Sequence, residues 1–159
     1  MARKTDASAG AALTIRDAKL SDARAFASLM CELGYETTSA EMRQRLKFIL
    51  SDAHLRTFVA EIDDHVCGMI GTLTHASHEH NDPSGKIIAL VVSEKQQRSG
   101  IGRALIAAAE EDFARRKVAR VSLTTRFARE KAHQFYEALG YSKTGFRFAK
   151  DRRHVAVRE

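Results

Sequence analysis

Residues 86–117 run KIIALVVSEKQQRSGIGRALIAAAEEDFARRK, and the rest of the chain is interpreted outward from this stretch. The apolar, largely β-branched run from Ile87 to Val92 is typical of a buried strand. Apolar residues then recur at helical spacing and predict an amphipathic helix: Leu105, Ile106, Ala109 and Phe113. The stretch is therefore predicted to form a strand, a polar turn with two glycines, and a helix.

The turn at Gln97–Gly102 has the properties of an anion site. The first amides of a helix have no partner inside the helix, and the helix dipole adds partial positive charge there. Gly100 and Gly102 lack side chains where an anion has to approach the backbone closely. The pattern predicts a phosphate or pyrophosphate site, and the alternative is an ordinary turn that uses glycine for its geometry.

Composition indicates a soluble globular protein. The chain has 159 residues, 44% hydrophobic and 29% charged, with a net charge of +6. We expect a disordered tail over residues 1–12 and a single domain over residues 13–159. The basic residues are spread along the chain without an RNA-binding motif, no window is apolar enough to span a membrane, and no secretory signal is visible. We expect a cytoplasmic protein that binds neither nucleic acid nor membrane, with Cys31 and Cys67 reduced.

The order of the elements predicts an α/β (α+β) fold. Strands are expected at residues 13–17, 57–62, 66–74, 87–92 and 120–125, with a last pair at 141–144 and 154–158. Ser21 is expected to cap a first helix carrying Phe26, Leu29, Met30 and Leu33, and residues 38–41 form a capping box for a second. Further helices are expected after the glycine turn and at residues 130–139. The prediction is a mixed, mostly antiparallel sheet of about seven strands flanked by four helices.

The loop over residues 75–85 carries His75, His78 and His80 beside two carboxylates. Their spacing matches no metal motif, and the Pro-Ser-Gly end of the loop is typical of an exposed segment. We predict no metal site here and place the loop near the mouth of the active site.

Two motifs carry a family resemblance. Gln97–Gly102, which follows a strand ending in Val-Val, fits the pattern [Q/R]-x-x-G-x-[G/A]. It is not a phosphate loop, because no Lys-Ser or Lys-Thr follows the second glycine. It is not a dinucleotide-binding fingerprint either, because Leu105 stands in place of the third glycine. Ala132, Tyr136, Gly140 and Tyr141 fit N-x-x-A-x-x-x-Y-x-x-x-G-[F/Y], with Arg129 at the Asn position. Over about residues 13–150 the chain resembles the GNAT family of N-acetyltransferases, with these segments as motifs A and B.

The resemblance implies a three-layer fold, acetyl-CoA as cosubstrate, and the following site. The pantetheine arm pairs with the backbone of Leu90, Val91 and Val92, and the Val92 N–H is the oxyanion donor. The pyrophosphate is held by Gln97, Arg98, Ser99, Gly100, Ile101, Gly102 and Arg103. Tyr136 is the general acid beside the sulfur, with a packing aromatic as the alternative. Arg129 stands where the family's Asn helps to hold the pantetheine.

The implied reaction is acetyl transfer to a primary amine by direct attack in a ternary complex. A small-molecule amine is expected, since no extra domain is present to dock a protein; the alternatives are a protein or peptide acceptor and a non-catalytic acyl-CoA-binding module. Tyr35, Glu36 and Glu41 could meet a cationic amine. No acid lies between Lys86 and Ser93, so we expect proton loss through water, although four acids are candidate bases: Glu61, Asp63, Glu79 and Asp82. Family members often dimerise, so a homodimer is expected.

Overall fold

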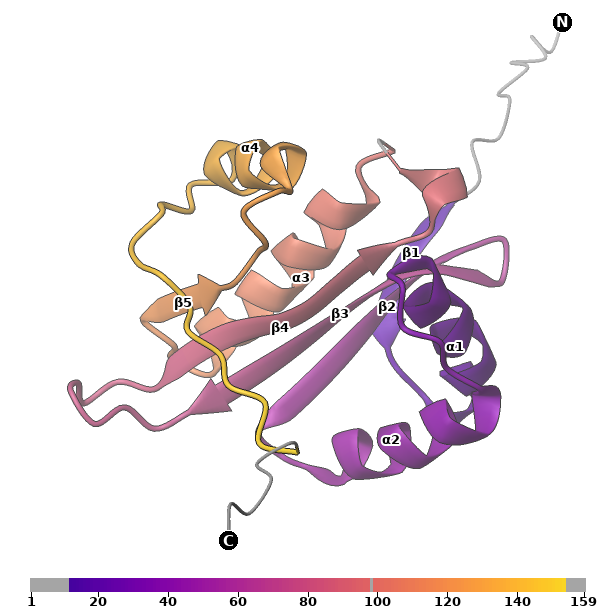
Figure 1. Cartoon of the computed structure of the whole chain (residues 1–159), viewed down its shortest axis with the longest axis horizontal. Coiled ribbons are helices and arrows are strands. Elements are labelled where there is room, and N and C mark those ends of the chain that lie inside the picture. The colour runs from indigo at the N-terminus through magenta and orange to yellow at the C-terminus, as the bar shows by residue number, and fades with distance from the viewer. Residues whose placement is uncertain (1–11, 98, 154–159) are drawn as a thin grey trace, which may run out of the picture. The chain divides into compact units, whose positions relative to one another are not determined.

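The computed structural model describes residues 12–97 and 99–153. The chain divides into two compact units, one ending at Leu123 and one beginning at Thr124, and each is described by itself (Figure 1). Arg98 and the expected strand at 154–158 lie outside the described residues.

The first unit is built on a five-stranded sheet of order β1-β2-β3-β4-β5. Its strands are β1 (Leu13–Asp17), β2 (Leu55–Ile62), β3 (His65–His75), β4 (Ser84–Val92) and β5 (Arg120–Leu123). Neighbours are antiparallel from β1 to β4, whereas β4 and β5 are parallel. The predicted mixed, mostly antiparallel sheet is confirmed. The expected number of about seven strands is wrong for the described residues, because residues 141–144 form no strand there.

Helices connect and cover the strands. The first unit contains η1 (Leu20–Asp22), α1 (Ala23–Glu32), α2 (Ser39–Ser51), η2 (Glu94–Gln96) and α3 (Ile101–Arg115), and the second contains α4 (Glu130–Ala138). The capping box before α2 is confirmed, since Glu41 N donates to Thr38 Oγ1 at 3.1 Å. The expected Ser21 cap is wrong: Ser21 lies inside η1, and the Asp22 carboxylate accepts from Lys19 N at 2.7 Å instead. Leu33 follows α1 and is 37% exposed rather than part of its buried face.

Apolar side chains cover both faces of this sheet and make three layers. On one face, Phe26 of α1 and Leu46 of α2 are fully buried in a cluster with Val59, Met69 and Val91, which align across β2, β3 and β4. On the other face α3 packs so closely against the strands at two positions that only glycine fits there. A Cβ on Gly68 would lie 3.2 Å from Leu105 Cδ1, and one on Gly85 would lie 2.6 Å from Phe113 Cε1.

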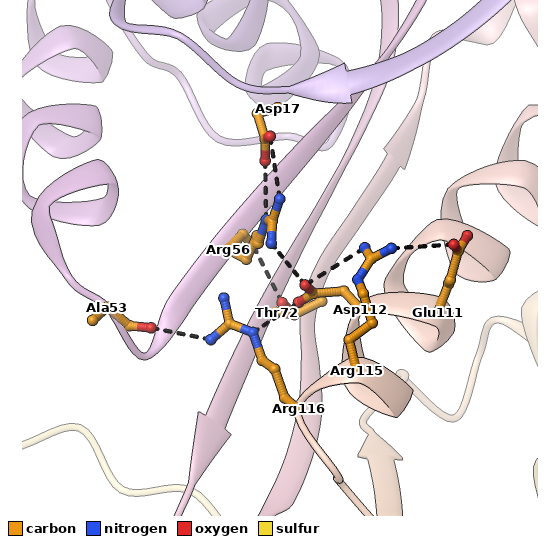
Figure 2. A network of polar contacts seen from close by, with 8 residues as sticks. All are labelled: Asp17, Ala53, Arg56, Thr72, Glu111, Asp112, Arg115 and Arg116. Atoms are coloured by element: carbon orange, nitrogen blue, oxygen red, sulfur yellow. Dashed lines mark hydrogen bonds and ion pairs between the residues drawn. The ribbon is translucent and has the colours of Figure 1, made fainter.

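Two ion-pair networks fix the edges of the sheet. Arg16 of β1 donates two hydrogen bonds of 2.9 Å to the buried Asp22 carboxylate and one of 2.8 Å to Glu61. Figure 2 shows the second network, in which Arg56 of β2 lies between Asp17 of β1 and Asp112 of α3. Asp112 is 2% exposed, so this network anchors the C-terminal half of α3 to the sheet.

Candidate active site

Strands β4 and β5 are paired over only part of β4. The parallel register runs from Ser84↔Arg120 to Ile87↔Leu123 and stops there. From Ile88 to Val92, β4 continues with no described strand on that side, while its other edge stays paired with β3 (Figure 1). A register shift between Gly71 and Thr72 leaves Ile88 without a partner, which marks a β-bulge in β4 at the start of this open edge.

Strand alternation decides which backbone groups face the open edge. Ser93 N donates to Cys67 O of β3 at 2.8 Å, so the polar groups of Ser93 and, two residues earlier, of Val91 point toward β3. Those of Leu90 and Val92 point the other way, toward the open edge. The outward backbone groups of Leu90 and Val92 can therefore pair with an added chain. Those of Val91 pair with β3, and its side chain lies in the core.

The glycine turn ends in a helix N-terminus of the expected kind. Gly100 precedes α3 in the left-handed conformation, with φ of +81°, and among the described residues other than its two chain neighbours no atom lies within 4 Å of the position a Cβ would take. The first intrahelical bond comes from Ala104 N to Gly100 O, at 3.0 Å. The N–H groups of Ile101, Gly102 and Arg103 thus have no acceptor within the helix. An open approach, aligned amides and a 15-residue helix dipole fit a diphosphate.

The remaining residues of the turn differ in exposure. Gln97 and Ser99 are exposed; Gln97 Nε2 donates to Val92 O at 3.4 Å, and the Ser99 hydroxyl donates to Gln96 O. Arg103 is exposed at the first turn of α3, where its guanidinium is free to reach an anion, whereas the Ile101 side chain is 1% exposed and anchors the turn in the core.

The second motif forms α4 and its C-terminal cap. Gly140 has a φ of +92°, and Tyr141 N donates to Tyr136 O at 3.0 Å, which closes the helix and explains why glycine is needed there. The Tyr136 ring packs edge-on against Phe135 and Tyr141, with centroids 5.2 Å and 6.2 Å away. Burial raises the pKa of Tyr136, and the charge of Arg129 at the start of the helix acts in the opposite direction. The phenol is thus protonated near neutral pH, as a general acid requires.

Two of the candidate bases lie at the far end of β4 from Val92, whereas Glu61 and Asp63 lie at the Val92 end of the sheet, because Ala60 pairs with Gly68 and Gly68 pairs with Val92. Glu79 and Asp82 precede the first residue of this nine-residue strand, so about 26 Å of strand separates them from Val92. Glu61 is committed to Arg16, with Oε2 accepting at 2.8 Å. Asp63 belongs to the turn between β2 and β3.

A different carboxylate, which the sequence did not single out, lies beside Val92. Glu32, the last residue of α1, accepts from Ser93 Oγ at 3.3 Å and from Glu94 N at 3.1 Å. A helix-end glutamate 61 residues before its partner leaves no pattern in the sequence. Of the residues expected to meet an amine, Tyr35 is 55% exposed, Glu36 is exposed, and Glu41 is held in the capping box.

The described histidine loop and helices carry no metal group and no membrane span. Among the described residues, no three His, Cys, Asp or Glu side chains form a group that could hold a metal ion. His75 Nδ1 instead contacts Ala76 O at 2.9 Å. None of the described helices combines the length and apolar character that crossing a membrane demands.

Comparison with known proteins identifies the family. A family model described as the acetyltransferase (GNAT) family matches residues 23–141. An aminoalkylphosphonate N-acetyltransferase of Salmonella typhimurium strain LT2 is 31% identical over 137 residues, which cover 86% of this chain and 89% of the relative. The chain therefore belongs to the GNAT acetyltransferase family, and the expected class, an acetyl-CoA-dependent N-acetyltransferase, is confirmed.

Solved structures show the same fold. A transcriptional regulator from Bacillus halodurans C-125 aligns with a TM-score of 0.83 at 20% identity, covering 88% of this chain and 99% of that one. The aminoglycoside N-acetyltransferase AAC(6')-Iy in complex with CoA aligns with a TM-score of 0.79 at 18% identity, covering 91% of this chain and 97% of that one. These likenesses confirm the GNAT-like α/β architecture.

Proposed function

We propose that this enzyme transfers the acetyl group of acetyl-CoA to the primary amine of a small molecule, by direct attack in a ternary complex. The observation that carries the proposal is the open edge of β4, which runs from Ile88 to Val92 and leads into the unpartnered amides at the start of α3. An extended amide chain can pair with the outward groups of Leu90 and Val92 as an added strand does. A diphosphate at its end meets the α3 amides.

Acetyl transfer requires an oxyanion donor, a proton donor for the leaving thiolate and a route by which the amine loses its proton. A neutral amine attacks the thioester carbonyl, and the resulting oxyanion requires a fixed donor, which we assign to the Val92 N–H. The departing thiolate requires a proton, which we assign to the Tyr136 phenol, whose raised pKa keeps it protonated. The ammonium form of the acceptor loses its proton through water, because Glu79 and Asp82 are distant from Val92 and Glu61 is paired with Arg16. Asp63 lies in the β2–β3 turn, beyond the end of β4.

The proposal of a small-molecule acceptor is supported by the Salmonella typhimurium relative. That relative is called an aminoalkylphosphonate N-acetyltransferase, and it matches most of both chains. A short amine that carries an anionic group is also compatible with a chain of net charge +6. We therefore propose aminoalkylphosphonates as the first acceptors to test.

The test of this function is turnover of acetyl-CoA with a panel of acceptors: an aminoalkylphosphonate, an aminoglycoside, and peptides with a free N-terminus or lysine. We expect turnover with small amines, highest for the aminoalkylphosphonate. Turnover with peptides alone would replace the proposed acceptor by a protein. Tight acetyl-CoA binding without turnover of any amine would indicate a non-catalytic acyl-CoA-binding module.

The role of Tyr136 has its own test. Tyr136→Phe should bind acetyl-CoA with unchanged affinity but lower kcat by about 100-fold, the contribution of one general acid. Tyr141→Phe is the matched control, because it removes a hydroxyl from the neighbouring ring of the same motif. Equal kcat in wild type and Tyr136→Phe would assign Tyr136 to packing.

A further inference from the structure

Glu32 joins two parts of the first unit that are far apart in sequence. Its Oε1 accepts from Ser93 Oγ at 3.3 Å and its Oε2 accepts from Glu94 N at 3.1 Å, so both carboxylate oxygens are bonded to one turn. Ser93 and Glu94 directly follow Val92, the last residue of β4. These hydrogen bonds connect the C-terminus of α1 to the turn that follows β4.

The Glu32 carboxylate supplies the N-terminal cap that η2 lacks. Glu94 begins the short helix η2, and its N–H is one of the first amides, which have no acceptor inside a helix. Ser93 precedes η2 but makes no side-chain cap of its own. The Glu32 carboxylate therefore acts as the cap from another element, and hydrogen bonds to a charged acceptor are among the stronger ones.

The peptide between Val92 and Ser93 is held from two directions. Ser93 N is bonded to Cys67 O of β3 at 2.8 Å, and the Ser93 side chain is bonded to Glu32 of α1. On the outward side, Val92 O accepts from Gln97 Nε2. These ties hold the Val92 C=O directly. The Val92 N–H lies in the preceding peptide, whose Val91 C=O faces β3, so Glu32 acts on this N–H through the backbone of Val92.

We propose that Glu32 is a positioning residue for acetyl transfer, which fixes the Ser93–Glu94 turn and so aims the Val92 N–H and the path into the α3 anion site. The inference rests on the proposed role of Val92. Small displacements of a donor at a reacting carbonyl have large effects on rate, which is why a carboxylate without contact to the substrate matters here.

The experiment compares Glu32→Ala, Glu32→Gln, Ser93→Ala and the double variant Glu32→Ala/Ser93→Ala with wild type. Glu32→Ala should lower kcat about tenfold and raise the KM for acetyl-CoA several-fold. Glu32→Gln should recover part of both losses, since its amide oxygen still accepts one hydrogen bond. Ser93→Ala should add little to Glu32→Ala, because both remove the same tie.

A second readout is independent of turnover. In the amide spectrum of the free protein, Glu32→Ala should shift the Val92, Ser93 and Glu94 signals and leave those of α3 beyond its first turn in place. Glu111→Gln, which removes an exposed carboxylate from α3, is the control and should shift none of the three.

Several outcomes would overturn the inference. Unchanged kcat, KM and Val92 signal in Glu32→Ala would show that the contact has no role in the reaction. A loss that is equal in Glu32→Gln and Glu32→Ala, together with a flattened acidic limb of the pH profile, would make Glu32 the general base instead. If wild type neither binds acetyl-CoA nor acetylates any amine, the proposed function fails. An active wild type matched by an equally active Glu32→Ala refutes this inference alone.

Discussion

Replacement of Asp112 by Asn tests whether the arginine network of Figure 2 holds α3 on the sheet. The Asp112 side chain is 3% exposed, with Oδ1 accepting from Arg56 Nη1 at 2.7 Å. Oδ2 lies 3.1 Å from Arg116 Nε as an ion pair, without a hydrogen bond. Breaking a fully buried ion pair costs about 3–5 kcal/mol. Arg56 and Arg116 are each about a third exposed and can regain water, and Arg56 keeps Asp17, so we discount that range. We expect a loss of about 2 kcal/mol.

The adjacent residue provides the control. Glu111→Gln removes the same charge from the same helix, but Glu111 is 72% exposed and pairs with Arg115 at i,i+4, which contributes about 0.3–0.5 kcal/mol. The assay is equilibrium unfolding in urea, in which Asp112→Asn should lower the midpoint at unchanged m-value and Glu111→Gln should barely move it. Equal losses in the two variants would show that burial of the carboxylate has no energetic importance here.

Three further predictions follow from the described contacts. Gly102→Glu should weaken acetyl-CoA binding at least tenfold relative to Gly102→Gln, because a carboxylate repels the diphosphate at the α3 amides; calorimetry on both folded variants measures this, and equal affinities would reject the site. Burial acts to raise the pKa of Asp22, but the hydrogen bonds and charge of Arg16 outweigh it and hold that pKa below its ordinary value. The stability gained from this pair is therefore present above about pH 4 and is lost as the pH falls further, so the difference in unfolding free energy between wild type and Asp22→Asn should shrink in acid. Cys31 is exposed, whereas burial raises the pKa of the Cys67 thiol, so a thiol reagent should modify Cys31 in the native protein and reach Cys67 only on unfolding; rapid double labelling would contradict the packing.

Sequence patterns predicted the elements that rely on local chemistry. The capping box before α2 and the glycine turn at the start of α3 depend on residues within one turn of each other, and each is present. The expected strand at residues 141–144 is wrong for the opposite reason. A strand exists through pairing with a distant segment, and residues 141–144 have β-forming composition but no strand partner among the described residues.

The parts of the candidate site that a local motif specifies could be predicted from the sequence. The parts that depend on contacts between distant segments could not. The motif spacing pointed to Leu90–Val92, whose role stays a prediction, but could not tell that the Val91 backbone faces β3, since the register depends on Cys67 and Ser93. The position of Glu79 in the loop that leads into β4 suggested it as a neighbour of the site, whereas the length of β4 separates it from Val92. Glu32 was missed because its contacts are 61 and 62 residues away in the chain.

If acetyl-CoA binds along the unpaired stretch of β4, as we propose, the stability of the protein depends on the supply of this cosubstrate. Residues 88–92, IALVV, are uncharged and strongly β-forming, and Ile88 is 50% exposed, so the free protein presents an edge on which a second chain could assemble. A bound acetyl-CoA that lies along this edge would cover it. By mass action, a ligand at 100 times its Kd adds about 2.7 kcal/mol to the unfolding free energy. The enzyme would then be protected from aggregation when acetyl-CoA is abundant and would be most exposed to loss when it is scarce.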